Sequence, residues 1–317
     1  MTTADAPTRT AVLLMAYGTP RTREEIEPYY TDIRRGRPPT PELLAELTAR
    51  YDALGGTSPL AARTEAQRVA LQAALDAAAP GRYEVVLGLK HAEPKIEAAV
   101  DALAASGTRR IVGLVLAPHY SAYSVGQYLD RARAAAEPHG ITVTGVKSWA
   151  IEPAFVDFVA ADLTARLAAM PEDTKVVFTA HSLPQRIVAT GDPYPDQLRA
   201  TAEAVAAAAG LGNWTRWAIA WQSAGRTPEP WLGPDILQVI DDLAASENHA
   251  GHPRGLLVSA VGFVADHLEV LYDLDIEAAA RAQAHGIAFA RTACVNDDPT
   301  VMAALSRRVI EADGAAG

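Results

Sequence analysis

The sequence predicts an α/β protein of two domains, each a four-stranded parallel sheet flanked by helices. Short apolar runs of strand length alternate with helical stretches along 317 residues, of which 49% are hydrophobic. Alternation of this kind is typical of parallel sheets covered by helices on both faces. The chain is too long for one ordinary core and suits two domains of about 150 residues each.

The order of the elements follows from the apolar runs and from the helical periodicity between them. The predicted strands are 11–17, 83–89, 111–117, 141–146, 175–179, 217–221, 255–261 and 287–295. The predicted helices are 41–54, 64–79, 94–105, 125–136, 153–170, 195–208, 235–245 and 299–311. Eight strands divide into two sets of four, so we expect domains at 1–150 and 151–317 with a hinge near 148–153. The C-terminal helix is expected to pack back on the first domain.

Composition excludes several classes of protein. A net charge of −10 disfavours nucleic acid as a partner, because phosphate binding needs concentrated Lys and Arg. Cys294 is the single cysteine, which excludes an intramolecular disulfide and a four-cysteine metal or iron-sulfur site built from this chain. The sequence has neither a long uninterrupted apolar stretch nor a secretory signal pattern, so we expect no membrane span and a cytoplasmic location.

Common catalytic motifs are also missing. The chain contains no G-x-G-x-x-G, P-loop, H-E-x-x-H or G-x-S-x-G pattern, which weakens nucleotide-dependent, zinc-protease and serine-hydrolase interpretations. Cys294 lies in a strand-like run, where a buried inert thiol is the usual outcome.

Ligands of open α/β sheets bind beyond the carboxyl ends of the strands, so the residues at those positions are the candidates. They are Tyr17, Lys90, His91, His119, His181 and Gln222. His181 ends an apolar run just before a proline-containing loop. Further along, Glu269, Asp273 and Glu277 recur at every fourth position and would form one acidic row on a helix. Histidine and carboxylates together can hold a divalent ion without thiolates, although a structural histidine and a solvated acidic face remain open.

A series of motifs resembles those of the ferrochelatase family, in the family's order and over nearly the whole chain. They are Leu14-Met15-Ala16-Tyr17-Gly18-Thr19-Pro20, Ile33-Arg34-Arg35-Gly36, Gly55-Gly56-Thr57-Ser58-Pro59-Leu60, Gly88-Leu89-Lys90-His91, His181-Ser182-Leu183-Pro184, Gln222-Ser223 and Gly262-Phe263-Val264-Ala265-Asp266-His267-Leu268-Glu269. The resemblance implies insertion of Fe2+ into a porphyrin by a monomer of two Rossmann-like, chelatase-type domains, with the macrocycle in the cleft between them.

The resemblance also implies roles for individual residues. His181 matches the family's metal-site histidine, and its implied role is proton abstraction or metal delivery. Glu269 matches the carboxylate that faces it, and Tyr17 matches the tyrosine that contacts the macrocycle. Asp273 and Glu277 match acidic helix positions that relay metal or protons.

Further matched positions point to the substrate. Short forms of this kind most resemble the Gram-positive branch, whose substrate is coproporphyrin III with four propionates. The expected porphyrin and propionate contacts are Tyr17, Arg34, Arg35, Arg50, Ser58, Lys90, His91 and Tyr128. Fe2+ is expected as a substrate, with no tightly bound cofactor, no iron-sulfur cluster and a transient handover of the product to the next heme-pathway enzyme.

Several other functions remain compatible with the sequence. One is a ferrochelatase that uses protoporphyrin IX, and another is a cobaltochelatase of the sirohydrochlorin pathway, which usually places two histidines where this chain offers His181 and Glu269. A third, from a different class, is a tetrapyrrole or metal carrier without chemistry. A heme sensor or chaperone would explain a cleft but not the acidic row.

Overall fold

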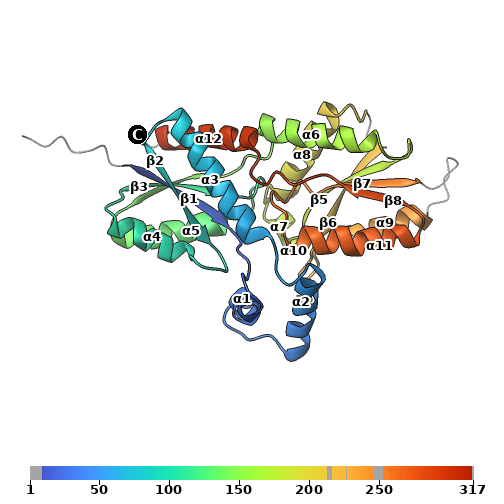
Figure 1. The fold of residues 1–317 in the computed structure, drawn as a ribbon, viewed down its shortest axis with the longest axis horizontal. Helices are drawn as coiled ribbons and strands as arrows, with labels where there is room; N and C mark the ends of the chain where they lie inside the picture. Colours follow the sequence, from blue (N-terminus) through green and yellow to red (C-terminus); the bar gives the residue numbers. More distant parts are fainter. Residues whose placement is uncertain (1–8, 213–215, 226, 246–252, 316–317) are drawn as a thin grey trace, which may run out of the picture. The chain divides into compact units, whose positions relative to one another are not determined.

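A computed structural model describes residues 9–212, 216–225, 227–245 and 253–315. Contacts divide the chain into two compact units: unit 1 comprises Met1–Trp149 with Asn296–Gly317, and unit 2 comprises Ala150–Val295. Each unit contains a four-stranded parallel sheet with helices packed on it (Figure 1). The predicted fold class is therefore confirmed.

The sheet of unit 1 has the strand order β2-β1-β3-β4, and all of its neighbouring strands are parallel. Its strands are β1 (Thr10–Ala16), β2 (Tyr83–Leu89), β3 (Arg110–Val115) and β4 (Thr142–Val146). The central strand β1 is buried along its whole length. A strand covered on both faces needs apolar residues at every position, which is why its sequence is an unbroken apolar run.

Helices cover both faces of this sheet. These helices are α3 (Leu60–Ala78), α4 (Ile96–Ala105), α5 (Val125–Ala136) and α12 (Pro299–Gly314). Unit 1 also contains α1 (Ile26–Ile33) and α2 (Pro41–Ala53), which contact each other, and 3-10 turns at Arg23–Glu25 and Glu137–His139. Helices α4 and α5 pack together, and they share a core with Leu13 and Met15 of β1. Helices α3 and α12 pack together on the other side of the sheet (Figure 1).

The C-terminal helix α12 is fastened to the amino end of the unit 1 sheet. The Asp313 carboxylate is buried and contacts Arg82 and Arg110 at 2.8 Å each. Arg82 directly precedes β2, and Arg110 is the first residue of β3. The Tyr83 hydroxyl also donates to Asp313, at 3.0 Å. This cluster lies at the end of the strands opposite to the one where ligands bind in open sheets.

The sheet of unit 2 has the order β6-β5-β7-β8, again all parallel. Its strands are β5 (Lys175–His181), β6 (Trp217–Gln222), β7 (Gly255–Ser259) and β8 (Ala288–Arg291). Its helices are α6 (Pro153–Leu167), α7 (Arg186–Ala189), α8 (Tyr194–Ala208), α9 (Ile236–Ala245), α10 (Leu268–Val270), a π-helix (Leu271–Ala278) and α11 (Ala279–Ala284). Helices α6 and α8 pack together (Figure 1). A core cluster joins α9 to the π-helix through Ile240 and Leu274.

Three local differences from the predicted elements bear on the site. Helix α1 was not predicted; its Pro28 lies in the first turn, where a proline is compatible with a helix because no intrahelical donor is lost. His181 is the last residue of β5 rather than the start of a loop. The run 287–295 yields only the short strand β8, and Cys294 lies beyond it.

Among the helices that the structure describes, none combines the length and the apolar character needed to cross a bilayer.

Candidate active site

The carboxyl ends of β5, β6 and β7 build the candidate site of unit 2. His181 ends β5 and pairs in register with Gln222, which ends β6. Beyond β7, the Gly262 N–H donates to the carbonyl of Thr179 at 3.0 Å. A Cβ at Gly262 would lie 2.4 Å from the Cβ of Ala180, so a larger residue would push the two segments apart. The glycine thus lets the chain after β7 cross closely beside β5.

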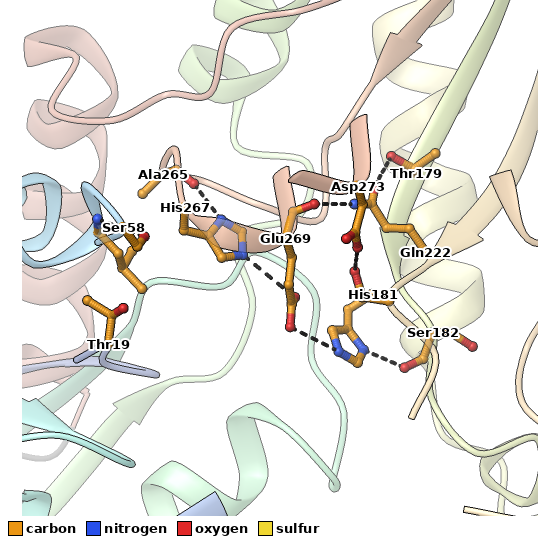
Figure 2. Close-up of polar contacts among 12 residues, drawn as sticks. Thr19, Ser58, Thr179, His181, Ser182, Gln222, Ala265, His267, Glu269 and Asp273 are labelled. Carbon is orange, nitrogen blue, oxygen red and sulfur yellow. Dashed lines mark hydrogen bonds and ion pairs between the residues drawn. The ribbon is translucent and has the colours of Figure 1, made fainter. Parts of the chain in front are cut away.

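The imidazole of His181 is held by backbone groups and faces Glu269 (Figure 2). Its Nδ1 lies 2.5 Å from the carbonyl oxygen of Ser182. A carbonyl only accepts, so Nδ1 carries the proton and donates. The neutral ring therefore presents the lone pair of Nε2, which lies 3.7 Å from Glu269 Oε1. Tyr194 donates its hydroxyl to the carbonyl of His181 at 3.0 Å, and burial, helped by the Glu269 charge, raises the pKa of Tyr194 and keeps it a donor.

His267 reaches the same carboxylate in a similar way. Its Nδ1 donates to the carbonyl of Ala265 at 2.9 Å, and its Nε2 lies 3.6 Å from Glu269 Oε2. The ring of Phe263 lies 5.0 Å from the ring of His267 and 6.5 Å from that of His181. His267 was not among the predicted site residues, although its position two residues before Glu269 was a signal that could have found it.

Two imidazoles with the same tautomer thus converge on the carboxylate of Glu269. In the neutral state both offer an Nε2 lone pair, and the carboxylate offers a negative charge between them. Such a group can accept a proton or bind a divalent cation that arrives with open coordination positions. Within the described part of the chain, no three or more His, Cys, Asp or Glu side chains are arranged to hold a metal ion. The pairwise distances of 3.6 and 3.7 Å instead describe an open arrangement.

The backbone of Glu269 is fixed from β6. Gln222 is 1% exposed; its Nε2 donates to the carbonyl of Glu269 at 3.2 Å, and its Oε1 accepts from Thr179 Oγ1 at 2.9 Å. Both ends of this buried amide are therefore satisfied, as burial of a polar group requires. Gln222 sets the position of Glu269 relative to the end of β5.

The segment that carries the acidic residues is not a regular α-helix. Glu269 lies in α10, while Asp273 and Glu277 lie in the π-helix. The N–H of Ala279 donates to the carbonyl of Leu274, five residues back, which is the hydrogen-bond pattern of a π-helix. Turns of this kind are rare and are frequent at functional sites.

The three carboxylates also differ from the predicted single row in their surroundings. Asp273 is 7% exposed, and its Oδ2 accepts from the hydroxyl of Ser223 at 2.5 Å (Figure 2). Ser223 has a φ of +58°, an unusual value for a residue other than glycine, which aims its side chain at the π-helix. Glu277 is half-buried further along. Ser223 and Gln222 form one of the motifs that carry the family resemblance, but the sequence predicted no role for either side chain.

In unit 1, Tyr17 and His91 come together at the carboxyl ends of β1 and β2. Their rings are 4.6 Å apart, and the His91 N–H donates to the carbonyl of Tyr17 at 2.9 Å. Tyr17 is 41% exposed, which is unusual for a large aromatic residue next to a core strand. His91 Nδ1 lies 2.6 Å from Asp32, whose other oxygen contacts Lys95 at 2.9 Å. Burial lowers the pKa of His91 to about 4 despite this contact, so the ring is neutral near pH 7.

Lys90 and Tyr128 form a second contact beside this pair. The Lys90 ammonium donates to Gln127 Oε1 at 2.8 Å and lies 5.1 Å from the ring centroid of Tyr128. Burial, and then the positive charges of Arg131 and Arg35, lower the pKa of Lys90 to about 8. Among the described residues its ammonium meets an amide oxygen rather than a carboxylate, so the charge of this half-buried cation is not neutralised.

The remaining predicted substrate residues lie elsewhere in unit 1. Arg34 and Arg37 donate to each other's carbonyls, at 3.2 and 3.3 Å, and Arg34 also lies over the ring of Tyr30. Ser58 is buried, and its hydroxyl accepts from the N–H of Leu60 at the start of α3. Arg50 is half-buried in the last turn of α2.

A cavity of about 350 Å³ opens where β1 and β2 end and α3 begins. It is lined by Gly18, Thr19, Arg21, Leu60, Ala61, Thr64, Glu65, Leu87 and Leu89. None of the predicted site residues lies in this lining, so the predicted substrate contacts do not converge on it.

Cys294 is buried, as expected of a structural thiol. Burial raises its pKa to about 12, and the negative charge of Asp266 adds to the effect. The thiol therefore remains protonated and is a weak nucleophile.

Comparison with solved structures identifies the class of fold. SirB from Bacillus subtilis, solved with Fe3+, matches with a TM-score of 0.58 and 13% identity, over 98% of each chain. The sirohydrochlorin chelatase SirB from Bacillus subtilis subspecies spizizenii, in complex with cobalt, matches with a TM-score of 0.50 and 14% identity, over 96% of each chain. At these identities the likeness shows the fold alone, which is the chelatase-type α/β fold.

Sequence comparison is more specific. The family model described as Ferrochelatase matches residues 9–313. A coproporphyrin III ferrochelatase from Halalkalibacterium halodurans is 45% identical, over 91% of this chain and 92% of the relative. A ferrochelatase from Herpetosiphon aurantiacus is 43% identical over 92% and 95%, and a coproporphyrin III ferrochelatase from Bacillus subtilis is 43% identical over 95% and 96%. The chain belongs to the ferrochelatase family and is a metal chelatase enzyme.

Proposed function

We propose that this enzyme inserts Fe2+ into coproporphyrin III and forms coproheme, in the synthesis of heme. Relatives named for this porphyrin are 43–47% identical over most of the chain. The observation that carries the chemistry is the pair of Nε2 lone pairs directed at one carboxylate.

The reaction needs both a base and an attraction for the metal. A porphyrin releases two N–H protons for each Fe2+ that it takes up, and the ion must first lose its water ligands. His181 accepts one pyrrole proton at Nε2, because Nδ1 is already protonated and held by the carbonyl of Ser182, and the second proton passes to water released from the ion. Glu269 stabilises the imidazolium that forms, and its charge attracts the incoming Fe2+. His267 offers a second nitrogen to the same ion.

The positive groups of unit 1 fit a substrate that carries several carboxylates. Lys90 is a half-buried ammonium without a carboxylate partner among the described residues, and Arg35 raises the local positive potential further. Coproporphyrin III has four propionates where protoporphyrin IX has two, so it gains more from such a surface. Tyr17, exposed at the end of β1, supplies an aromatic face for the macrocycle.

The finer setting of the reaction is also part of the proposal. The enzyme works as a cytoplasmic monomer, takes Fe2+ as a substrate rather than a resident cofactor, and passes coproheme to the next enzyme of the pathway. With Cys294 as its single cysteine, the chain cannot supply four thiolates to an iron-sulfur cluster.

Anaerobic Fe2+ insertion, followed by the absorbance change of the porphyrin, tests the proposal. Coproporphyrin III and protoporphyrin IX are assayed in parallel, with wild type, His181→Ala and the control His139→Ala, whose imidazole pairs with Asp101 on the surface of unit 1. We expect a strong preference for coproporphyrin III, and we expect His181→Ala to bind porphyrin without turnover. A preference for protoporphyrin IX would refute the substrate assignment, and tight binding without insertion in wild type would favour a carrier.

A further inference from the structure

Arg291 is a charged residue of unit 2 that the proposed chemistry does not use. It is the last residue of β8, and it pairs in register with Val258 of β7. Its side chain is only 15% exposed. A guanidinium this far from water requires close negative partners, since an unpaired buried charge is costly.

The guanidinium of Arg291 joins two carboxylates. Its Nε and Nη2 contact the two oxygens of Asp275 at 2.7 and 3.0 Å, and Nη2 also contacts Asp266 at 3.1 Å. Although burial opposes it, the hydrogen bond and the charge of Asp275 raise the pKa of Arg291, so the cation is permanent. The contact with Asp275 is a bidentate ion pair, a geometry that fixes the orientation of the guanidinium relative to the carboxylate as well as their distance.

The two carboxylates flank the segment that carries His267 and Glu269. Asp266 directly precedes His267, and Asp275 lies in the π-helix that follows Glu269. Cys294 lies in the loop that follows β8, and burial and then the charge of Asp266 raise the pKa of its thiol. One guanidinium therefore ties the start of this segment to its end, and ties both to the edge strand of the sheet.

We propose that Arg291 is a positioning residue for metal insertion. By bridging Asp266 and Asp275, it fixes the positions of His267 and Glu269 relative to each other. The proposal rests on the proposed function of the site. Arg291 itself touches neither the imidazoles nor the Glu269 carboxylate in its described contacts, so its effect passes through the backbone.

The local helix geometry explains why such a restraint matters. Glu269 lies in a three-residue α10 that passes directly into the π-helix. A change of the π turns to α-helical hydrogen bonding would alter the number of residues per turn and rotate Glu269 relative to Asp275. Such a rotation would move the Glu269 carboxylate away from its position between His181 and His267, whose Nε2 atoms lie 3.7 and 3.6 Å from its two oxygens.

Steady-state kinetics of Arg291→Gln test the proposal. We expect kcat for Fe2+ insertion to fall about 10- to 100-fold, as is typical when a group that orients metal-site residues is removed, while the KM for porphyrin stays within about twofold. Arg291→Lys should recover part of kcat, because a lysine ammonium keeps the charge but cannot make the bidentate contact. The matched control is Arg281→Gln, which removes an arginine that contacts Asp241 at 3.1 Å from α11 of the same unit.

A second variant and a second readout separate this proposal from folding and from the proposed function. Asp275→Asn keeps Arg291 paired with Asp266 and should lower kcat by a smaller factor than Arg291→Gln. If Arg291→Gln does not fold, an unchanged kcat in Asp275→Asn overturns the proposal. Imidazole nitrogen NMR should show the Nδ1–H tautomer of His267 in wild type and its loss or exchange broadening in Arg291→Gln.

The outcomes are distinguishable. An unchanged kcat in Arg291→Gln, or an equal loss in Arg281→Gln, would overturn the positioning role. A wild-type enzyme that inserts no metal would refute the proposed function, while the NMR comparison would still decide whether Arg291 holds His267.

Discussion

The charge of Lys90 makes porphyrin binding depend on pH. Its pKa is lowered from the ordinary 10.5 to about 8 by burial and by Arg131 and Arg35. At about 1.4 kcal/mol per pKa unit, the difference disfavours the cation by about 3 kcal/mol. A propionate beside the ammonium would offset this cost of keeping Lys90 protonated, because an opposite charge favours the charged form.

The sign of the effect follows from proton linkage. Between about pH 8 and 10.5 the unfolded chain binds more protons at Lys90 than the folded one, so without porphyrin the folded state gains stability as the pH rises through this range. Porphyrin binding has the opposite dependence, since it requires the protonated amine. With a pKa of about 8, the protonated fraction is about 0.9 at pH 7 and about 0.1 at pH 9, so affinity should fall about tenfold.

Fluorescence titration of coproporphyrin III in the absence of metal, between pH 6.5 and 9.5, measures this dependence. Lys90→Met should bind more weakly at pH 7 and lose the dependence near pH 8. Lys175→Met is the matched control, because Lys175 begins β5 at the opposite end of a strand from the site of unit 2. A pH-independent affinity in wild type, or the same dependence in Lys90→Met, would refute the reasoning.

Two further predictions concern stability and metal choice. Asp313→Asn should lower the free energy of unfolding by about 2 kcal/mol, because hydrogen bonds to a charged group are lost. The loss is not larger because the half-exposed Arg82 and Arg110 can be solvated. Urea denaturation measures the change, and an unchanged midpoint would contradict the prediction. Zn2+ should also be inserted in vitro, because a site such as that of His181 and Glu269 binds Zn2+ at least as well as Fe2+; complete failure with Zn2+ in anaerobic porphyrin absorbance assays would count against a His/carboxylate site.

Much of the fold could be predicted because the strands of a parallel sheet are apolar at nearly every position. Strand β2 has the predicted bounds, and β1 and β5 begin within a residue of them. Helix α1 was not predicted, although its Pro28 lies in the first turn, where a proline is compatible with a helix. The π-helix could not be predicted, since the spacing of Glu269 and Asp273 fits an α-helical face and the i+5 hydrogen bonds depend on tertiary contacts.

The candidate site was predictable in its residue types but not in its geometry. His181 and Glu269 were marked by the end of a strand and by a motif, and they lie near each other. The surroundings of Asp273 and Lys90 were not visible in the sequence, because burial and the partners Ser223 and Gln127 come from distant parts of the chain. Arg34 illustrates the opposite case. The sequence suggested an exposed basic residue, but its guanidinium donates to the carbonyl of Arg37 in the same turn.

The protonation pattern of the site is set by the main chain rather than by neighbouring side chains. The carbonyls of Ser182 and Ala265 each accept from an Nδ1, which leaves both Nε2 atoms free on the side of Glu269. A carbonyl only accepts hydrogen bonds, so each ring, when neutral, keeps its proton on Nδ1. Because Gly262 and Gln222 fix the same backbone relative to β5 and β6, the fold itself supplies the orientation of the lone pairs. The chemistry of metal insertion therefore depends on how firmly this backbone is held, which is the property that Arg291 is proposed to provide.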